Sequence, residues 1–318
     1  MPLGEFELID RFFTRRTARR DVLLGVGDDA ALLEVPAGRA LVAATDTLVE
    51  GTHFLPGAPA RSVGHNALAV NLSDLAAMGA EPAWALLSLS LPEADEAWLT
   101  EFSAGLLELA DEHGVALVGG DTVRGSRVIT VELLGFVDPS LALRRSGARP
   151  GDLLYVSGSP GESAAGLDAL RRGASFDAPD DPLIRRHLYA EPRIALGRAL
   201  GGIASAAMDV SDGLLGDLHK LCESSGAGAT LELDSLPVSA ALLSRYTRSE
   251  FERFVLFGGD DYELLFTVAP EHAARVDAGL GVSTKVTRIG RMLERPGVQC
   301  TRAGVEVAVD GGGYDHFS

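Results

Sequence analysis

Apolar and polar residues follow one another along this chain in short blocks that have either a helical or a strand period. Between residues 95 and 113, large apolar residues recur every three or four positions from Trp98 to Leu109, and Gly114 follows. This spacing predicts an amphipathic helix that ends at the glycine. Residues 84–91 instead alternate in the manner of a half-buried strand.

The other elements of the first half follow from the same pattern. We expect helices at residues 5–16 and 62–77, and strands at residues 22–25, 31–35, 40–45, 115–118 and 128–137. A Gly-Asp-Asp turn separates the first two strands. Strands and helices thus alternate through residue 137.

A turn-rich stretch from Asp138 to Gly151 separates this half from the next. The second half is predicted to hold strands at 153–156, 206–210, 264–268 and 284–291, and helices at 163–172 and 214–224. The fold class expected is therefore α/β (α+β) with two domains, an N-terminal domain over residues 1–140 and a C-terminal α/β domain over residues 141–318.

Composition narrows the classes of protein that this chain can represent. Its 318 residues are 46% hydrophobic and 23% charged, as in ordinary soluble domains. No apolar run approaches the roughly 18 residues of a membrane span, and the acidic N-terminus does not resemble a signal peptide. Two cysteines cannot form a disulfide scaffold. We expect a cytoplasmic protein.

Charge excludes further classes. The net charge of −17 disfavours nonspecific binding to nucleic acid or anionic membranes. Lys220 and Lys285 are the only lysines, and no G-x-x-x-x-G-K-[ST] sequence is present, so a P-loop is excluded. Any phosphate chemistry must therefore obtain most of its positive charge from bound cations.

Aspartates carry the chemical signal, because they recur beside glycine, serine or threonine at the ends of the expected elements. They are Asp28, Asp29, Asp46, Asp74, Asp121, Asp209, Asp212, Asp260 and Asp261. Each alone is typical of a turn or a helix cap. Together, their carboxylates and the adjacent hydroxyls are the hard oxygen ligands that Mg²⁺ prefers.

Two of these positions are the most informative. Asp74 shares a face with Asn71 on a helix rich in Ala, Leu and Val, where a buried carboxylate is costly unless it is paired or binds a metal. A buried hydrogen-bond network is the alternative. Asp209 and Asp212 lie where a strand meets a helix N-terminus, which is a natural anion site; Asp212 can also be a simple helix cap. The loop from Gly158 to Gly161 can cradle phosphate or merely join a strand to a helix.

An ordered set of motifs resembles the thiamine-monophosphate kinase family. The motifs are Gly-Val-Gly-Asp-Asp-Ala at 25–30, Ala-Thr-Asp-Thr-Leu-Val at 44–49, Gly-Thr-His-Phe at 51–54, Asn-Leu-Ser-Asp-Leu-Ala-Ala-Met-Gly-Ala at 71–80, Gly-Gly-Asp-Thr at 119–122, Asp-Val-Ser-Asp-Gly-Leu at 209–214, Gly-Gly-Asp-Asp-Tyr-Glu at 258–263 and the Gly-Tyr-Asp-His-Phe tail. They cover essentially the whole chain. The resemblance implies a fold like aminoimidazole ribonucleotide synthetase, with an N-terminal four-stranded sheet that joins a dimeric barrel in a homodimer.

The resemblance also implies an activity, in which the γ-phosphoryl group of ATP passes to thiamine monophosphate and yields thiamine diphosphate. It assigns several Mg²⁺ ions to Asp29, Thr45, Asp46, Asp74, Asp121, Asp209 and Asp212; ATP to Gly120, Asp121, Arg145 and Ser211; and thiamine monophosphate to His53, Asp260 and Tyr314. Three positions depart from the family pattern: Ala44 and Ser103 lack groups that some relatives have, and Asp260 stands where glutamate is common.

No general base is needed, because the acceptor phosphate has a second pKa of about 6 and is already largely ionised at neutral pH. No catalytic side-chain nucleophile is expected either, because the sequence offers no well-supported one and both reacting groups are phosphates that metals can align. Metal-assisted, direct in-line transfer is therefore predicted. The alternatives are another ATP-dependent enzyme of the superfamily, such as a selenophosphate synthetase, and a non-catalytic relative that binds nucleotide and metal.

Overall fold

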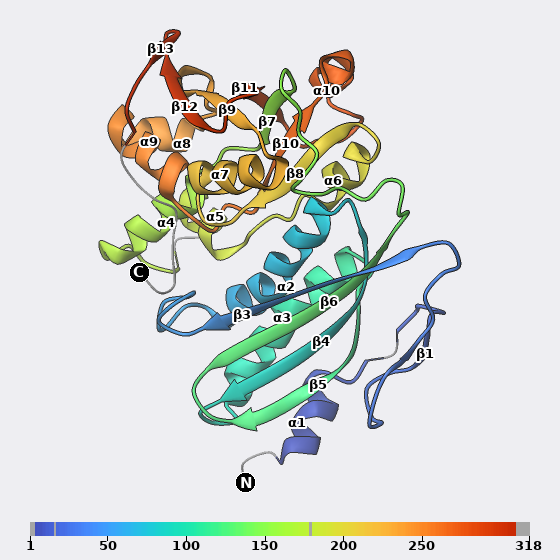
Figure 1. Cartoon of the computed structure of the whole chain (residues 1–318). Coiled ribbons are helices and arrows are strands. Elements are labelled where there is room, and N and C mark those ends of the chain that lie inside the picture. The colour runs from blue at the N-terminus through green and yellow to red at the C-terminus, as the bar shows by residue number, and fades with distance from the viewer. Residues whose placement is uncertain (1–3, 16, 178–179, 310–318) are drawn as a thin grey trace. The chain divides into compact units, whose positions relative to one another are not determined.

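The computed structural model describes residues 4–15, 17–177 and 180–309, and Figure 1 traces them through helices and strands. By internal contacts the chain divides into two compact units. The first comprises Met1–Leu75 and Ala80–Pro139, and the second comprises Ala76–Gly79 and Ser140–Ser318. Among the described residues, no helix combines the length and apolar character that crossing a membrane requires.

The first unit is built on a four-stranded sheet with the strand order β3-β6-β4-β5. Its elements are α1 (Glu5–Phe12), β1 (Val22–Leu24), β2 (Leu32–Leu33), β3 (Ala40–Val49), α2 (Ala60–Ala77), β4 (Glu81–Leu91), α3 (Glu96–Glu112), β5 (Ala116–Arg124) and β6 (Val128–Val137). Strand β6 pairs antiparallel with both β3 and β4, whereas β4 and β5 are parallel. The four-stranded sheet implied by the family resemblance is therefore present.

One face of this sheet is apolar and packs against α2, where Leu75 lies against Gly135 of β6. The helices α2 and α3 run along the same side of the sheet (Figure 1). They approach closely at Gly64 and Gly105, since a methyl group at either position would overlap a backbone carbonyl of the other helix. On the opposite face, which we call the outer face, the β1–β2 hairpin packs beside Trp84.

The largest differences from the sequence expectation in the first unit concern α1, β3 and β5. Helix α1 ends at Phe12 because the chain leaves the helix to bury both Phe12 and Phe13. Strands β3 and β5 extend past their expected ends, to Val49 and Arg124. Ladder pairing with β6 and β4 continues through the Thr, Asp and Gly residues that, by local propensity, signal a turn.

The second unit contains a seven-stranded sheet with the order β13-β12-β9-β11-β7-β10-β8. Its strands are β7 (Leu153–Ser157), β8 (Ala204–Val210), β9 (Gly228–Glu232), β10 (Glu263–Val268), β11 (Val286–Leu293), β12 (Gly297–Arg302) and β13 (Val305–Glu306). Strand β10, next to the edge strand β8, is buried along its whole length between β7 and β8, and both of these pair antiparallel with it.

Helices surround this second sheet. They are α4 (Glu162–Arg171), α5 (Pro182–Leu188), α6 (Ile194–Leu200), α7 (Leu214–Ser225), α8 (Ala240–Arg245), α9 (Arg248–Phe257) and α10 (Ala273–Asp277), with short 3-10 turns at Leu233–Ser235 and Pro270–His272. Helix α7 packs Leu214, Leu218 and Leu221 into the core, as its sequence period predicts. The order of elements places the loops after β7, β8 and α9 close to the start of β10, as the hydrogen bonds below show.

Candidate functional site

The first unit contains a cavity of about 1030 Å³ on the outer face of its sheet. The side chains and backbone that line it come from the turn that carries Asp28 and Asp29, from α1, and from all four strands of the sheet. The polar lining residues are Glu5, Asp28, Asp29, Thr45, Ser88, Asp121, Thr122, Thr130 and Glu132. A cavity of this size can hold a nucleotide-sized ligand.

Strand register explains why these polar groups meet. Thr47, Thr130, Ser88 and Asp121 lie opposite one another on successive strands, so that a polar row crosses the sheet. The hydroxyls of Thr47 and Thr130 are 2.8 Å apart. Because this row ends at the edge strand β5, the Asp121 carboxylate is exposed at the cavity wall.

Backbone geometry positions acidic residues at two places, at Asp121 within strand β5 and in the turn that carries Asp28 and Asp29. Gly120 has a φ of 153°, and a side chain there would overlap the Leu87 carbonyl oxygen, so glycine permits β5 to lie this close to β4. The Thr122 amide donates to Asp121 Oδ1 (2.9 Å), and the Asp29 amide donates to Asp28 Oδ1 (2.8 Å). Each carboxylate is thus oriented by a single backbone hydrogen bond.

The polar residues that line the cavity are suited to bind a cation that is also coordinated by phosphate. Asp29, Thr45 and Asp121 offer hard oxygen atoms in one cavity. Within the described residues, however, no group of three acidic, histidine or cysteine side chains is close enough to hold a metal unaided. Mg²⁺ usually keeps water molecules and takes substrate phosphate oxygens as ligands, so one or two carboxylates are sufficient.

Asp46 and Asp74 do not line this cavity. Asp46 follows Thr45 along β3 and therefore points to the opposite face of the sheet. Asp74 is half-buried on α2, and Asn71 is fully buried one turn before it. The Asn71 amide donates to the Ala67 carbonyl oxygen, whereas its Oδ1 has no hydrogen-bond partner among the described residues. A buried, unsatisfied oxygen beside a carboxylate is compatible with a polar ligand at this point of the helix.

His53 has a structural partner. It lies in the turn after β3, where its Nδ1 accepts a hydrogen bond from the Val49 amide (3.1 Å). This bond defines the orientation of the ring. The histidine is half-buried. The structure therefore supports a positioned imidazole at residue 53.

In the second unit, Asp209, Ser211 and Asp212 lie together at the end of β8. The buried Asp217 organises this turn, since its Oδ2 accepts the amides of Ser211 (2.9 Å) and Asp212 (3.0 Å). Helix α7 begins after Gly213 without a side-chain cap. The alternative that Asp212 merely caps this helix is therefore wrong; its carboxylate instead meets Lys220 Nζ.

Electrostatics at this turn are dominated by burial. Burial raises the pKa of the Asp217 carboxyl, although a hydrogen bond from Lys220 opposes the shift. Burial works against ionisation of Lys220 as well, but the carboxylates of Asp212 and Asp217 outweigh it and raise the pKa of the lysine. Lys220 therefore remains a cation at neutral pH.

The segment from Gly258 to Tyr262 docks beside this turn. The Asp260 amide donates to the Ser211 carbonyl oxygen (2.9 Å), and the Tyr262 amide donates to that of Val210 (2.8 Å). Asp260 and Tyr262 have positive φ values of 64° and 52°, which are strained for residues other than glycine. Tyr262 also donates its hydroxyl proton to Asp260 Oδ1 (3.2 Å). This strained segment holds Asp260 next to Ser211.

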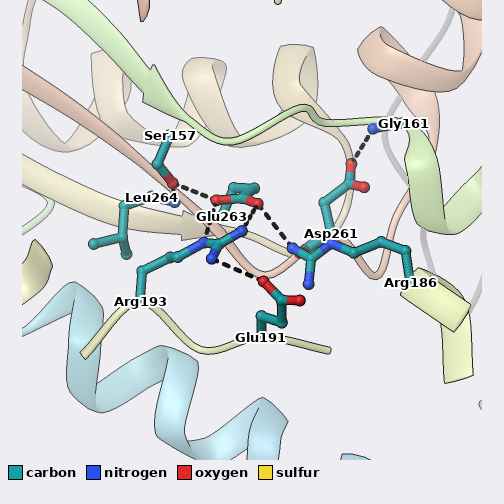
Figure 2. A network of polar contacts seen from close by, with 8 residues as sticks. All are labelled: Ser157, Gly161, Arg186, Glu191, Arg193, Asp261, Glu263 and Leu264. Carbon is teal, nitrogen blue, oxygen red and sulfur yellow. Dashed lines mark hydrogen bonds and ion pairs between the residues drawn. The ribbon is translucent and has the colours of Figure 1, made fainter. Parts of the chain in front are cut away.

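The two neighbouring aspartates face different surroundings. Asp261 is 1% exposed, and its Oδ2 accepts the Gly161 amide (2.7 Å), as Figure 2 shows. Burial raises the pKa of Asp261 well above its usual range. Asp260 is only half-buried and remains the member of the pair that can meet a ligand.

Beneath Asp261 lies a buried ion network (Figure 2). Glu263 is 1% exposed and accepts hydrogen bonds from Arg186 (2.8 Å), from Arg193 (2.7 Å to Nε) and from the Ser157 hydroxyl. Arg186 also donates to the Asp261 carbonyl oxygen (2.7 Å). Burial opposes ionisation of Glu263, but the two arginines outweigh it and lower its pKa. The network thus ties β7, β10 and the α5–α6 region to the Asp260 segment.

This network also decides the role of the loop from Gly158 to Gly161. The Gly158 amide donates to the Lys285 carbonyl oxygen, and the Gly161 amide is taken by Asp261. A side chain at Gly158 would overlap the Glu263 carboxylate. Both glycine amides are bonded within the protein, which favours the interpretation that the loop joins a strand to a helix over a phosphate cradle.

Two expected ligand residues remain. Arg145 is exposed and lies beside the C-terminal end of α7, where its carbonyl oxygen accepts the Ser225 hydroxyl (3.2 Å). Its side chain is therefore accessible to an anion. Tyr314 lies outside the described residues.

Comparison with known proteins gives matches along the whole chain. The family models for AIR synthase related protein match residues 27–137 with the N-terminal domain and residues 149–302 with the C-terminal domain. A thiamine-monophosphate kinase from Salmonella typhimurium is 47% identical over 323 residues, covering 100% of this chain and 99% of the relative.

Two solved structures extend the comparison. The crystal structure of thiamine-monophosphate kinase from Stenotrophomonas maltophilia K279a has a TM-score of 0.87 and 45% identity, covering 94% of this chain and 97% of that one. A structure described as AaThiL complexed with AMPPCP and TMP has a TM-score of 0.78 and 34% identity, covering 89% of each chain.

The buried network predicts a large stability difference between two glutamates that both contact Arg193. Glu263→Gln leaves the buried Arg186 and the half-buried Arg193 without this carboxylate and should cost about 3–5 kcal/mol of unfolding free energy. Glu191→Gln is the control, because the Glu191 side chain is 65% exposed and should matter little. Chemical denaturation measures both.

The stability difference between Glu263→Gln and Glu191→Gln should also depend on pH. Since the folded-state pKa of Glu263 is lowered from the ordinary value of 4.5, its stabilising contribution is present above that pH and is lost as pH falls through the folded-state value. Equal stability of Glu263→Gln and Glu191→Gln at pH 7 would contradict the role assigned to the network.

Proposed function

We propose, on the premise that this chain belongs to the thiamine-monophosphate kinase family of AIR synthase related proteins, that it phosphorylates thiamine monophosphate with ATP. The products are thiamine diphosphate and ADP. The observation that carries this proposal is the 47% identity to a kinase of that name over the full length of both chains. The cavity on the outer face agrees in size and in polarity.

The residues divide into roles by motif. Mg²⁺ is held in the first unit by Asp29, Thr45, Asp46, Asp74 and Asp121, and in the second unit by Asp209 and Asp212. ATP is contacted by Gly120 and Asp121 of the first unit and by Arg145 and Ser211 of the second. The acceptor is contacted by His53 of the first unit and by Asp260 and Tyr314 of the second. Bound Mg²⁺ supplies positive charge that neutralises the phosphates and aligns them for transfer. Exposed carboxylates at Asp29 and Asp121 are the strongest support for this assignment.

The protein's own contribution to transfer is positioning. Carboxylates and hydroxyls orient the phosphates for in-line transfer, and the acceptor phosphate needs no general base, because it is already largely ionised. We therefore propose direct transfer without a phosphoenzyme. A selenophosphate synthetase-like activity is disfavoured, because the full-length relative with 47% identity is a thiamine-monophosphate kinase.

We propose further that the chain forms a homodimer in the cytoplasm through its N-terminal sheet. Large apolar side chains exposed on this unit include Leu23, Leu24, Leu32, Leu41 and Val123. They lie on the β1–β2 hairpin and on the two edge strands of the sheet, β3 and β5. Exposed apolar side chains are typical of a surface that another protein covers. Both cysteines are buried free thiols, which suits a reducing compartment.

The activity is tested by incubating the protein with ATP, Mg²⁺ and thiamine monophosphate. Thiamine diphosphate and ADP should form in equal amounts, and unphosphorylated thiamine should give no thiamine diphosphate. Separation of the thiamine compounds by chromatography provides the measurement. Folded protein that makes no thiamine diphosphate would instead favour the non-catalytic alternative.

The metal assignment is tested by Asp121→Asn, which keeps the acceptor for the Thr122 amide but removes the charge. Turnover should fall by about a hundredfold or more, as for other single groups that stabilise developing charge. Asp95→Asn is the matched control, since Asp95 caps α3 and asparagine caps helices equally well. Near-normal turnover of Asp121→Asn at limiting Mg²⁺ would refute the assignment.

The dimer is tested by Leu41→Asp, which places a charge on the exposed side of the edge strand β3. Light scattering at micromolar concentration should show a dimer for the parent chain and a shift towards monomer for the variant. Leu243→Asp, at an exposed leucine of the second unit, should remain dimeric. A parent chain that is an active monomer contradicts the proposal.

A further inference from the structure

Lys220 sits between two carboxylates that differ in their freedom to move. Its Nζ lies 2.5 Å from Asp212 Oδ2 and 2.8 Å from Asp217 Oδ1. The Asp217 side chain is fully buried and is also fixed by the amides of Ser211 and Asp212. The Asp212 side chain is 33% exposed and projects from the turn between β8 and α7. One carboxylate is therefore a fixed anchor, and the other can exchange its partner.

This arrangement matters because Asp212 is also the proposed ligand of a divalent metal. A metal and an ammonium group cannot both sit against the same small carboxylate without strong like-charge repulsion. Because the ammonium group of Lys220 is stable beside Asp212, the surroundings of this carboxylate fit a bound cation. Lys220 also competes with the metal for Asp212.

We propose that Lys220 is a resident cation that holds Asp212 until a divalent metal displaces it, and that Asp217 retains the lysine after the exchange. The inference rests on the proposed function through the assignment of Asp212 as a metal ligand. Lys220 acts through Asp212 and is a positioning residue. Its ammonium keeps the turn at Ser211 ordered without metal and weakens metal binding there.

The two neighbours of Asp212 then have opposite effects on metal affinity. Lys220→Met keeps the aliphatic stem but removes the competitor, so metal binding should tighten by about two- to fivefold, the equivalent of one partly exposed ion pair. Asp217→Asn removes the anchor that receives the displaced lysine. Lys220 then depends on Asp212 alone, and metal binding should weaken by a similar factor of about two to five. A merely structural role for Lys220 would not give shifts of opposite sign.

The test uses Mn²⁺ as a paramagnetic probe, titrated into the full chain at a saturating concentration of a non-hydrolysable ATP analogue. Electron paramagnetic resonance of free Mn²⁺ gives the dissociation constant without turnover. Lys220→Arg should restore the parent constant, because it keeps the charge. Lys285→Met is the matched control, since it removes the other lysine of the chain, which is exposed and lies on a different segment.

The outcomes separate the inference from the function on which it rests. If Asp212→Asn loses affinity for Mn²⁺ but Lys220→Met binds Mn²⁺ as the parent does or more weakly, the resident-cation inference is overturned and the metal assignment of Asp212 stands. If Asp212→Asn itself binds Mn²⁺ normally, the metal assignment of the proposed function fails. If thermal denaturation shows that Lys220→Met does not fold, Asp217→Asn decides the question. Mn²⁺ binding by Asp217→Asn that is equal to or tighter than binding by the parent chain also overturns the inference.

Discussion

Charge is the constraint on which the rest of this structure depends. Two phosphate-bearing substrates repel each other, and this chain adds a net charge of −17 with only two lysines. The proposed reaction therefore requires cations between the reacting groups, and the proposed role of the protein is to offer oxygen atoms that hold them. The polar row that ends at Asp121 and the turn at Asp29 provide such oxygens in one cavity. The fold of the first unit can be understood as the means of placing them there.

The second unit meets a different demand, which is rigidity. Its buried arginines and Glu263 bind the segment after α9 to β7 and to the α5–α6 region (Figure 2). A segment with two positive φ values is unfavourable unless the surroundings fix it. Asp261 and Glu263 supply that fixation from below, while Asp260 remains accessible. Of these neighbouring acidic residues, Asp261 and Glu263 thus serve structure, and Asp260 is the one proposed to contact the acceptor.

Much of this architecture is predictable from local sequence. The period from Trp98 to Leu109 gives α3, and Asp95 caps that helix with hydrogen bonds to the amides of Ala97 and Trp98. Short helices such as α5 and α9 escape prediction, because their apolar faces span only one or two turns. Their N-terminal signals are nevertheless present: Asp181 precedes Pro182, and Thr247 with Glu250 forms a capping box.

The candidate site is less predictable, because it depends on contacts between residues that are distant in sequence. The sequence indicates which aspartates are unusual, and their motifs imply their roles. It does not indicate that Thr45 and Asp46 point to opposite faces of a longer strand, since the end of β3 is set by pairing with β6. It also does not indicate that the Gly161 amide is occupied by Asp261, a partner 100 residues away. Such pairings follow from sheet order and burial.

The central claim is that Asp29 and Asp121 hold metal beside phosphate in the cavity of the first unit. Crystals grown with Mn²⁺, a non-hydrolysable ATP analogue and thiamine monophosphate test it through anomalous scattering at the manganese edge. We expect an anomalous peak about 2–2.3 Å from a carboxylate oxygen of Asp29 or Asp121 and from a phosphate oxygen. Manganese bound only by phosphates and water, with neither carboxylate in contact, would contradict it.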